Sequence, residues 1–124
     1  MQTKIENRQR LWEVMSEFYL DTELQNYDYR SIVEVLLESN KSIEELIEID
    51  KYEVFPVLKY NLINVSGVWT AFDMNWLFDE CAKNHHQKNK LYFRIKVKIN
   101  MLFIRYNNKE HWEIIKRMIN KDEQ

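Results

Sequence analysis

A sequence of 124 residues has the length of one ordinary domain, and its 45% hydrophobic and 14% aromatic content is that of a globular protein. One glycine and one proline leave few turn-forming residues, which argues against a many-stranded β protein and excludes a glycine-rich phosphate loop. The composition predicts an all-α fold, a compact bundle of six or seven helices in one domain over residues 1–124.

Cysteine content and hydropathy predict a cytoplasmic protein. The one cysteine, Cys81, cannot form an internal disulfide, and the first ten residues hold no apolar run of the kind found in a secretory signal. The most apolar stretch, residues 91–104, contains Arg94, Lys96 and Lys98 and falls short of the ~18 uncharged residues of a transmembrane helix. We therefore expect no membrane segment.

Charge is divided unevenly along the chain. The net charge is −2, but residues 1–82 hold 16 acidic and 7 basic side chains, whereas residues 83–124 hold 4 acidic and 11 basic ones. Such a charge asymmetry indicates either binding to charged partners or ion pairing between the two parts of the molecule, and it does not determine the fold.

Apolar residues at helical spacing predict the first three helices. The first covers residues 5–20, and the second follows a capping residue, Asn26 or Asp28. Ser42 and Glu45 form a capping box that opens the third, which ends near Asp50 or continues by one turn before Pro56. The apolar positions of the first two helices are Leu11, Met15, Phe18 and Tyr19, then Tyr29, Ile32, Val33, Leu36 and Leu37.

The single proline and the single glycine predict a non-helical connection between them. Pro56 removes a helical hydrogen bond, and Gly67 adopts a positive φ at no steric cost. Because the residues between them are largely apolar, we expect this connection, residues 56–67, to be buried against the helices on either side.

Three further helices are predicted in the second half. Asp73 caps one that ends around Asn84, with residues 85–87 as a turn. Residues 91–104 fit both an alternating strand and a helix, and we favour the helix because no other stretch alternates convincingly enough to pair with a strand. Asn107 or Asn108 then caps a terminal helix, whose inward side chains are Trp112, Ile115, Met118 and Ile119.

Two sets of residues are candidate sites. The first is an acidic surface on the second and third helices, suited to a basic protein partner, although solvated faces of this kind are common: Glu34, Glu38, Glu44, Glu45 and Glu48. The second is a pocket of carboxylates beside aromatic rings, although helix capping also explains Asp21 and Asp73: Asp21, Glu23, Asn61, Trp69, Asp73 and Trp76.

No catalytic residue, metal ligand or cofactor is predicted. His85, His86 and His111 lack the spacing of known zinc sites, and Cys81 lies on an apolar face where a buried thiol is the ordinary outcome. The basic segment from Lys83 to Arg105 could contact phosphates, but the acidic remainder would repel nucleic acid, which we therefore consider an unlikely partner.

Two segments carry a resemblance to a known family. LWEVMSEFYLDTEL and EVFPVLKYNLINVSGVWTAFDMNWL resemble a family of small bacterial proteins with no assigned function, in which W-x-x-L-S-x-x-F-L-D-T-E-L and E-V-x-P-V-L-x-x-N-L-x-x-V-A-G-E-W recur. Trp12, Asp21, Glu53 and Pro56 stand at matching positions, while Val68 replaces a glutamate. The resemblance implies a compact helical domain and carries no chemistry.

We therefore expect an interaction protein without enzymatic activity. By analogy with small single-domain bacterial proteins encoded beside toxins, the specific hypothesis is an immunity-type protein that neutralises a basic partner toxin through the acidic surface. A small enzyme or ligand-binding protein that uses the carboxylate pocket is the first alternative, and a nucleic-acid-associated protein that uses the basic third is the second. Oligomeric state is left open.

Overall fold

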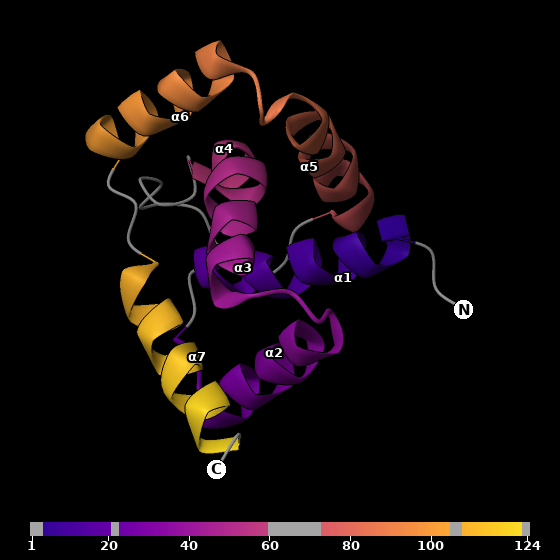
Figure 1. Ribbon diagram of the computed structural model, residues 1–124, viewed down its shortest axis with the longest axis vertical. Helices are drawn as coiled ribbons and strands as arrows, with labels where there is room; N and C mark the ends of the chain where they lie inside the picture. Colours follow the sequence, from indigo (N-terminus) through magenta and orange to yellow (C-terminus); the bar gives the residue numbers. More distant parts are fainter. Residues whose placement is uncertain (1–3, 21–22, 60–72, 105–107, 123–124) are drawn as a thin grey trace.

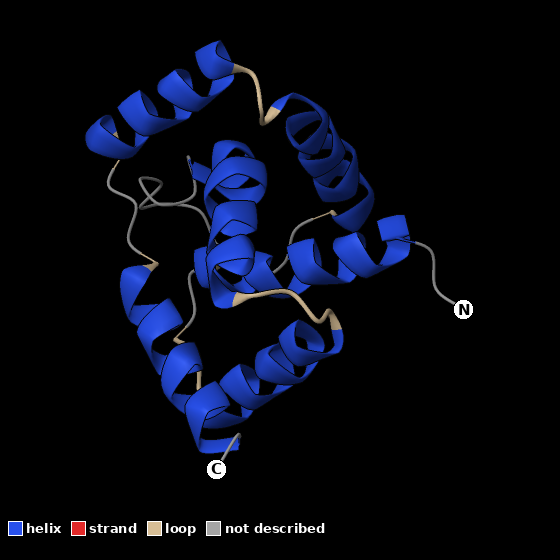
Figure 2. Ribbon diagram, viewed as in Figure 1, coloured by secondary structure: helices blue, strands red, loops and turns tan. Residues whose placement is uncertain are grey.

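The computed structural model describes residues 4–20, 23–59, 73–104 and 108–122, and these are helical apart from short connections, with no strand (Figure 2). This confirms the predicted all-α class. The elements are α1 (Lys4–Ser16), a 3-10 turn η1 (Glu17–Tyr19), α2 (Asn26–Glu38), α3 (Ile43–Ile49), a π-helical segment η2 (Asp50–Val54), α4 (Phe55–Leu58), α5 (Met74–Gln87), α6 (Leu91–Phe103) and α7 (Lys109–Asp122).

Two helix starts use capping boxes. Ser42 Oγ accepts a hydrogen bond from Glu45 N at 3.1 Å, and this confirms the predicted cap of α3. The predicted cap of α2 is wrong by one residue or more, because Gln25 is the N-cap and Asp28 accepts a hydrogen bond from the Gln25 N–H at 2.8 Å. Asn40, with φ of 59°, follows α2 in the left-handed conformation that asparagine tolerates.

A continuous helical rod, formed by α3, η2 and α4, occupies the centre of the molecule (Figure 1). Our prediction that the connection begins at Pro56 is wrong, because Pro56 lies in the first turn of α4. Proline is tolerated there because the N–H groups of a first turn need no helical acceptor. Leu58 is buried, and the predicted connection beyond Lys59 lies outside the described residues.

The other helices surround this rod. The predicted turn at residues 85–87 is wrong, since α5 continues to Gln87, and the helix predicted over residues 91–104 is confirmed. α6 presents Phe93 and Val97 to the interior and lies at the periphery of the molecule (Figure 1). No helix in the described part of the chain is both long and apolar enough to cross a bilayer.

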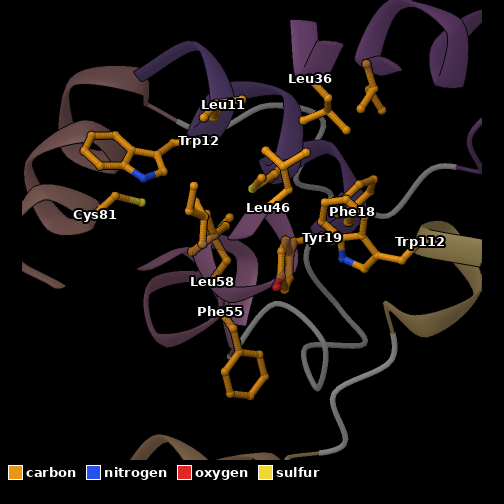
Figure 3. Close-up of a cluster of buried hydrophobic side chains, with 14 of the residues drawn as sticks. Leu11, Trp12, Phe18, Tyr19, Leu36, Leu46, Phe55, Leu58, Cys81 and Trp112 are labelled. Carbon is orange, nitrogen blue, oxygen red and sulfur yellow. The ribbon is translucent and has the colours of Figure 1, made fainter. Parts of the chain in front are cut away.

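Aromatic and aliphatic side chains from all parts of the fold form one core around the rod. Trp12 lies beside Cys81, and Trp112 beside Tyr19 and Phe18 (Figure 3). Trp112 is 3% exposed, and its ring meets Phe18 edge to face with ring centres 5.5 Å apart, a favoured aromatic geometry. The core therefore joins α1, η1, α5 and α7 to the central rod.

Candidate functional site

Two carboxylates, three residues apart in sequence, are buried on η2. Asp50 and Glu53 are both 0% exposed in a segment that packs against α1, α5 and α6. An isolated charge in an apolar interior is costly, so a buried carboxylate requires hydrogen-bond donors or cations around it. π-Helical segments frequently occur at functional sites, so these two carboxylates are candidate functional groups.

Glu53 is surrounded by donors from α1 and from the C-terminal end of α5. Its Oε1 accepts hydrogen bonds from Arg8 Nε and Trp12 Nε1, each at 2.9 Å. Its Oε2 accepts from Arg8 Nη2 at 2.6 Å and from Lys88 Nζ at 3.0 Å. The carboxylate thus accepts four hydrogen bonds, about its full capacity, and leaves no lone pair for a substrate.

The surroundings of Glu53 keep it ionised. Burial alone would raise the pKa of its carboxyl, but the hydrogen bonds and charge of Arg8, with those of Trp12 and Lys88, outweigh burial and hold the pKa below its ordinary value of 4.5. A saturated carboxylate with a lowered pKa is a poor general base or acid near neutral pH. The arrangement therefore holds α1 and α5 against the rod.

This pKa predicts a loss of stability in acid. Because the folded-state pKa of Glu53 lies below 4.5, its contribution is complete above that pH and is lost as the pH falls through the folded value. Urea unfolding at a series of pH values should show this decline in the wild type and a weaker one in Glu53→Gln. Burial also lowers the pKa of His85 and His111 below 6.5, so their effect begins at higher pH. Equal slopes below pH 4.5 in both proteins would contradict the assignment.

His85 and Asn84 complete the surroundings of Glu53. His85 Nδ1 lies 3.5 Å from Glu53 Oε2, and burial together with the charges of Arg8 and Lys88 lowers the pKa of the imidazole, so His85 is neutral at pH 7. Asn84 Nδ2 donates to the Glu53 backbone oxygen at 3.0 Å, which satisfies a carbonyl of the π-helical segment.

Asp50 makes an equivalent network toward the other end of the fold. Its Oδ1 accepts a hydrogen bond from the Tyr19 hydroxyl at 2.7 Å, and its Oδ2 accepts from Asn108 Nδ2 at 3.0 Å and Trp112 Nε1 at 2.9 Å. These donors come from η1, from the residue before α7 and from α7 itself. The rod thus holds one carboxylate toward α1 and α5 and the other toward η1 and α7.

A family model for a domain of unknown function (DUF7079) matches residues 6–118, a range that contains both networks. The chain belongs to this family. No curated protein and no solved structure matches the chain. Membership agrees with the resemblance of the two sequence segments, and the family has no assigned function.

Of the six residues predicted to form a carboxylate pocket, the structure describes three. Asp73 is exposed and caps α5, accepting a hydrogen bond from Trp76 N at 3.2 Å, as helix capping alone would require. Trp76 is 46% exposed, and Glu23 is exposed ahead of α2. Asp21, Asn61 and Trp69 lie outside the described residues.

The five glutamates of the predicted acidic surface differ in their exposure and in their hydrogen-bond partners. Glu34 and Glu44 are exposed on α2 and α3. Glu38 accepts a hydrogen bond from Arg10 at 2.8 Å, and Glu48 accepts one from Arg94 at 3.2 Å. Glu45 belongs to the capping box of α3. Glu38 and Glu48 are therefore paired with arginines within the fold, which reduces the negative charge available to a partner protein.

His111 and Cys81 are two further titratable side chains that lie within the core or at its edge. His111 stacks on Phe18 with ring centres 4.9 Å apart, and its Nδ1 lies 2.7 Å from the Tyr29 hydroxyl. Cys81 is 0% exposed, and burial raises the pKa of its thiol well above the ordinary range, so the thiolate nucleophile does not form near neutral pH. Across residues 4–20, 23–59, 73–104 and 108–122, no group of three His, Cys, Asp or Glu side chains is placed to hold a metal ion.

Sequence reasoning missed the outward face of α6. Six large apolar side chains on it are 47–84% exposed, and we call them the α6 ridge: Leu91, Tyr92, Ile95, Ile99, Leu102 and Phe103. At about 100° per residue they fall within about 120° of the helix circumference, opposite Phe93 and Val97. Lys98 borders the ridge on one side and Lys96 on the other. The two competing periodicities of residues 91–104 were the signal for a helix that is apolar on two faces.

Proposed function

We propose that this protein is a non-enzymatic interaction module that binds a partner protein through the α6 ridge. The observation that carries the proposal is the exposure of this ridge, with Leu102 and Phe103 each 84% exposed. Contiguous exposed apolar surface bordered by polar residues is typical of protein interaction sites. The saturated state of Glu53 supports the non-enzymatic part of the proposal.

The border of the ridge defines the chemistry of the partner. Lys96 and Lys98 flank the apolar side chains, so the complementary surface is an apolar strip bordered by carboxylates, such as one face of an acidic amphipathic helix. A second copy docked ridge to ridge would place lysines against lysines, which disfavours self-association. The partner is therefore an acidic amphipathic segment of another protein.

Selection of peptides from a displayed library of helical sequences tests this proposal. Enriched peptides should be acidic and amphipathic, and their dissociation constants by fluorescence anisotropy should rise at least about tenfold in Ile95→Glu and Leu102→Glu, because each change removes apolar contact and repels the acidic border. Both side chains are exposed, so the thermal unfolding midpoint should change little. Leu37→Glu on α2, where Leu37 is 43% exposed, is the matched control.

Three outcomes would contradict the proposal. Enrichment of basic peptides that lose affinity in Glu44→Lys would move the binding site to the acidic surface. Binding to phosphatidylserine vesicles that is lost in Ile95→Glu would replace the protein partner by a membrane. Dimerisation in sedimentation experiments that is lost in the same variant would replace it by a second copy.

An immunity-type role is the second candidate function. It is favoured by the exposed Glu34 and Glu44 together with the excess of acidic residues in the first two thirds of the sequence. In this role the acidic surface would cover a basic toxin and neutralise it. The two candidates require partners of opposite charge, so the charge of the selected peptides distinguishes them.

A further inference from the structure

A cavity of about 250 Å³ lies between α4, the C-terminal end of α5 and the first turns of α6. Three lysines from different parts of the chain line it: Lys59 directly after α4, Lys90 before α6, and Lys96 within α6. Asn84, Gln87 and Asn100 add three carboxamide groups, and no aspartate or glutamate is among the described residues of its lining. We call this cavity the lysine pocket.

Three neighbouring cations outside the lysine pocket are already paired. Lys88 contacts Glu53, Lys83 contacts Glu80 at 3.0 Å, and Arg94 contacts Glu48 at 3.2 Å. Lys90 and Lys96 lie within 4.0 Å of no carboxylate of the described residues. The cavity therefore contains two ammonium groups, those of Lys90 and Lys96, without a carboxylate partner among the described residues.

Lys59 lies near Lys96 in the wall of this cavity. Lys59 is 9% exposed, and burial followed by the charge of Lys96 lowers the pKa of its ammonium group. Burial is the larger of the two causes, and the second shows that the like charges of Lys59 and Lys96 lie close together. An anion that entered the cavity would relieve that repulsion.

We propose that the lysine pocket is a binding site for a phosphate monoester on a small organic molecule. The ammonium groups of Lys90 and Lys96 can neutralise the nearly dianionic phosphate, and lysine binds phosphate as a point charge without the planar fork that favours arginine for carboxylates. The carboxamides of Gln87 and Asn100 can donate further hydrogen bonds to its oxygens.

The size and walls of the cavity indicate the organic part of the ligand. The volume of about 250 Å³ is several times the ~30 Å³ that a water molecule occupies in liquid, so more than a bare ion fits. Phe93 and Val97 provide an apolar wall, and Tyr92, 79% exposed, stands at the mouth. A small sugar or polyol phosphate therefore fits better than a large apolar ligand. This inference does not rest on the partner proposed for the α6 ridge, although Tyr92 and Lys96 belong to both surfaces.

Nuclear magnetic resonance titration of the ¹⁵N-labelled protein tests the site, with glycerol phosphate, inorganic phosphate and acetate as probes at constant ionic strength. Glycerol phosphate should cause saturable shifts at Lys59 and in residues 84–100 with a dissociation constant below about 1 mM. Lys96→Met and Lys90→Met should each weaken binding roughly tenfold, the effect of losing one charge-assisted contact. Both lysines are exposed, so these variants should fold normally.

Lys98→Met is the matched control, because Lys98 is an exposed lysine of the same helix that does not line the cavity. The absence of saturable shifts, or an equal loss of affinity in Lys98→Met, would overturn the proposal. Acetate binding as tight as that of the phosphates would overturn the ligand class. Inorganic phosphate binding as tightly as glycerol phosphate would overturn the organic part of the ligand.

Discussion

Replacing Glu53 by glutamine should lower the free energy of unfolding by about 3 to 5 kcal/mol, the usual cost of removing one partner from a buried ion pair. The glutamine oxygen can still accept hydrogen bonds from Arg8 Nε and Trp12 Nε1. Its NH₂ group, however, can only donate, and it would face the donors Arg8 Nη2 and Lys88 Nζ, which in the wild type lie 2.6 and 3.0 Å from Oε2. These two donors would therefore lose their acceptor. Urea denaturation followed by circular dichroism measures the change.

The same substitution at an exposed pair is the control for Glu53→Gln. Glu38 accepts a hydrogen bond from Arg10 at 2.8 Å, and its side chain is 60% exposed. Exposed pairs contribute between about 0.2 and 1 kcal/mol, so Glu38→Gln should change the free energy of unfolding by no more than that. If both variants lose equally little, the network around Glu53 does not hold the fold together.

The effect of Glu53→Gln follows from which elements the carboxylate joins. Arg8 and Trp12 belong to α1, Lys88 follows α5, and Glu53 lies between them on the rod. Two cations would remain near a neutral side chain, and Arg8 is only 14% exposed, so water can solvate its guanidinium group only in part. The variant should therefore lose the packing of α1 and α5 on the rod together.

Local signals made the helices predictable. Ser42 and Glu45 interact across three residues, so their capping box is visible in the sequence, and the Asp73 cap is equally local. Pro56 misled the prediction because proline ends most helices, while here the π-helical segment leads directly into a new first turn that accommodates it.

Long-range contacts made the buried carboxylates unpredictable. Asp50 and Glu53 resemble ordinary polar residues at the end of a helix, and their partners lie far away in sequence: Trp12 is 41 residues from Glu53, and Trp112 is 62 from Asp50. An acidic residue within the apolar run YEVFPVL was the available signal, and Trp12 and Glu53 both stand in the recognised motifs. Similarly, periodicity identified α6 as a helix but could not decide which of its two apolar faces turns inward.

Replacing Asp50 by alanine should cost at least about 3 kcal/mol, because three buried donors lose their acceptor and each unsatisfied group costs roughly 1 to 3 kcal/mol. The donors are the Tyr19 hydroxyl, Asn108 Nδ2 and Trp112 Nε1. Asp50→Asn is the matched variant. Its oxygen can accept from Asn108 and Trp112 while its NH₂ donates to the Tyr19 oxygen, so it should lose only about 1 kcal/mol. Equal losses in the two variants would show that the charge, and not the hydrogen bonding, is what matters at this position.

The position along α7 at which Asp50→Ala reduces protection from hydrogen exchange tests whether the Asp50 network holds one end of this helix or the whole of it. Asp50 holds the start of α7 through Asn108 and Trp112, whereas farther along α7, Met118 and Lys121 line a groove together with Val33 and Leu37 of α2. Hydrogen exchange measured by mass spectrometry should therefore show the largest loss of protection in residues 108–115 and a smaller one in residues 116–122. Uniform loss along α7 would mean that the helix detaches as a unit. The carboxylate would then set the overall docking of α7 and not its orientation at one end.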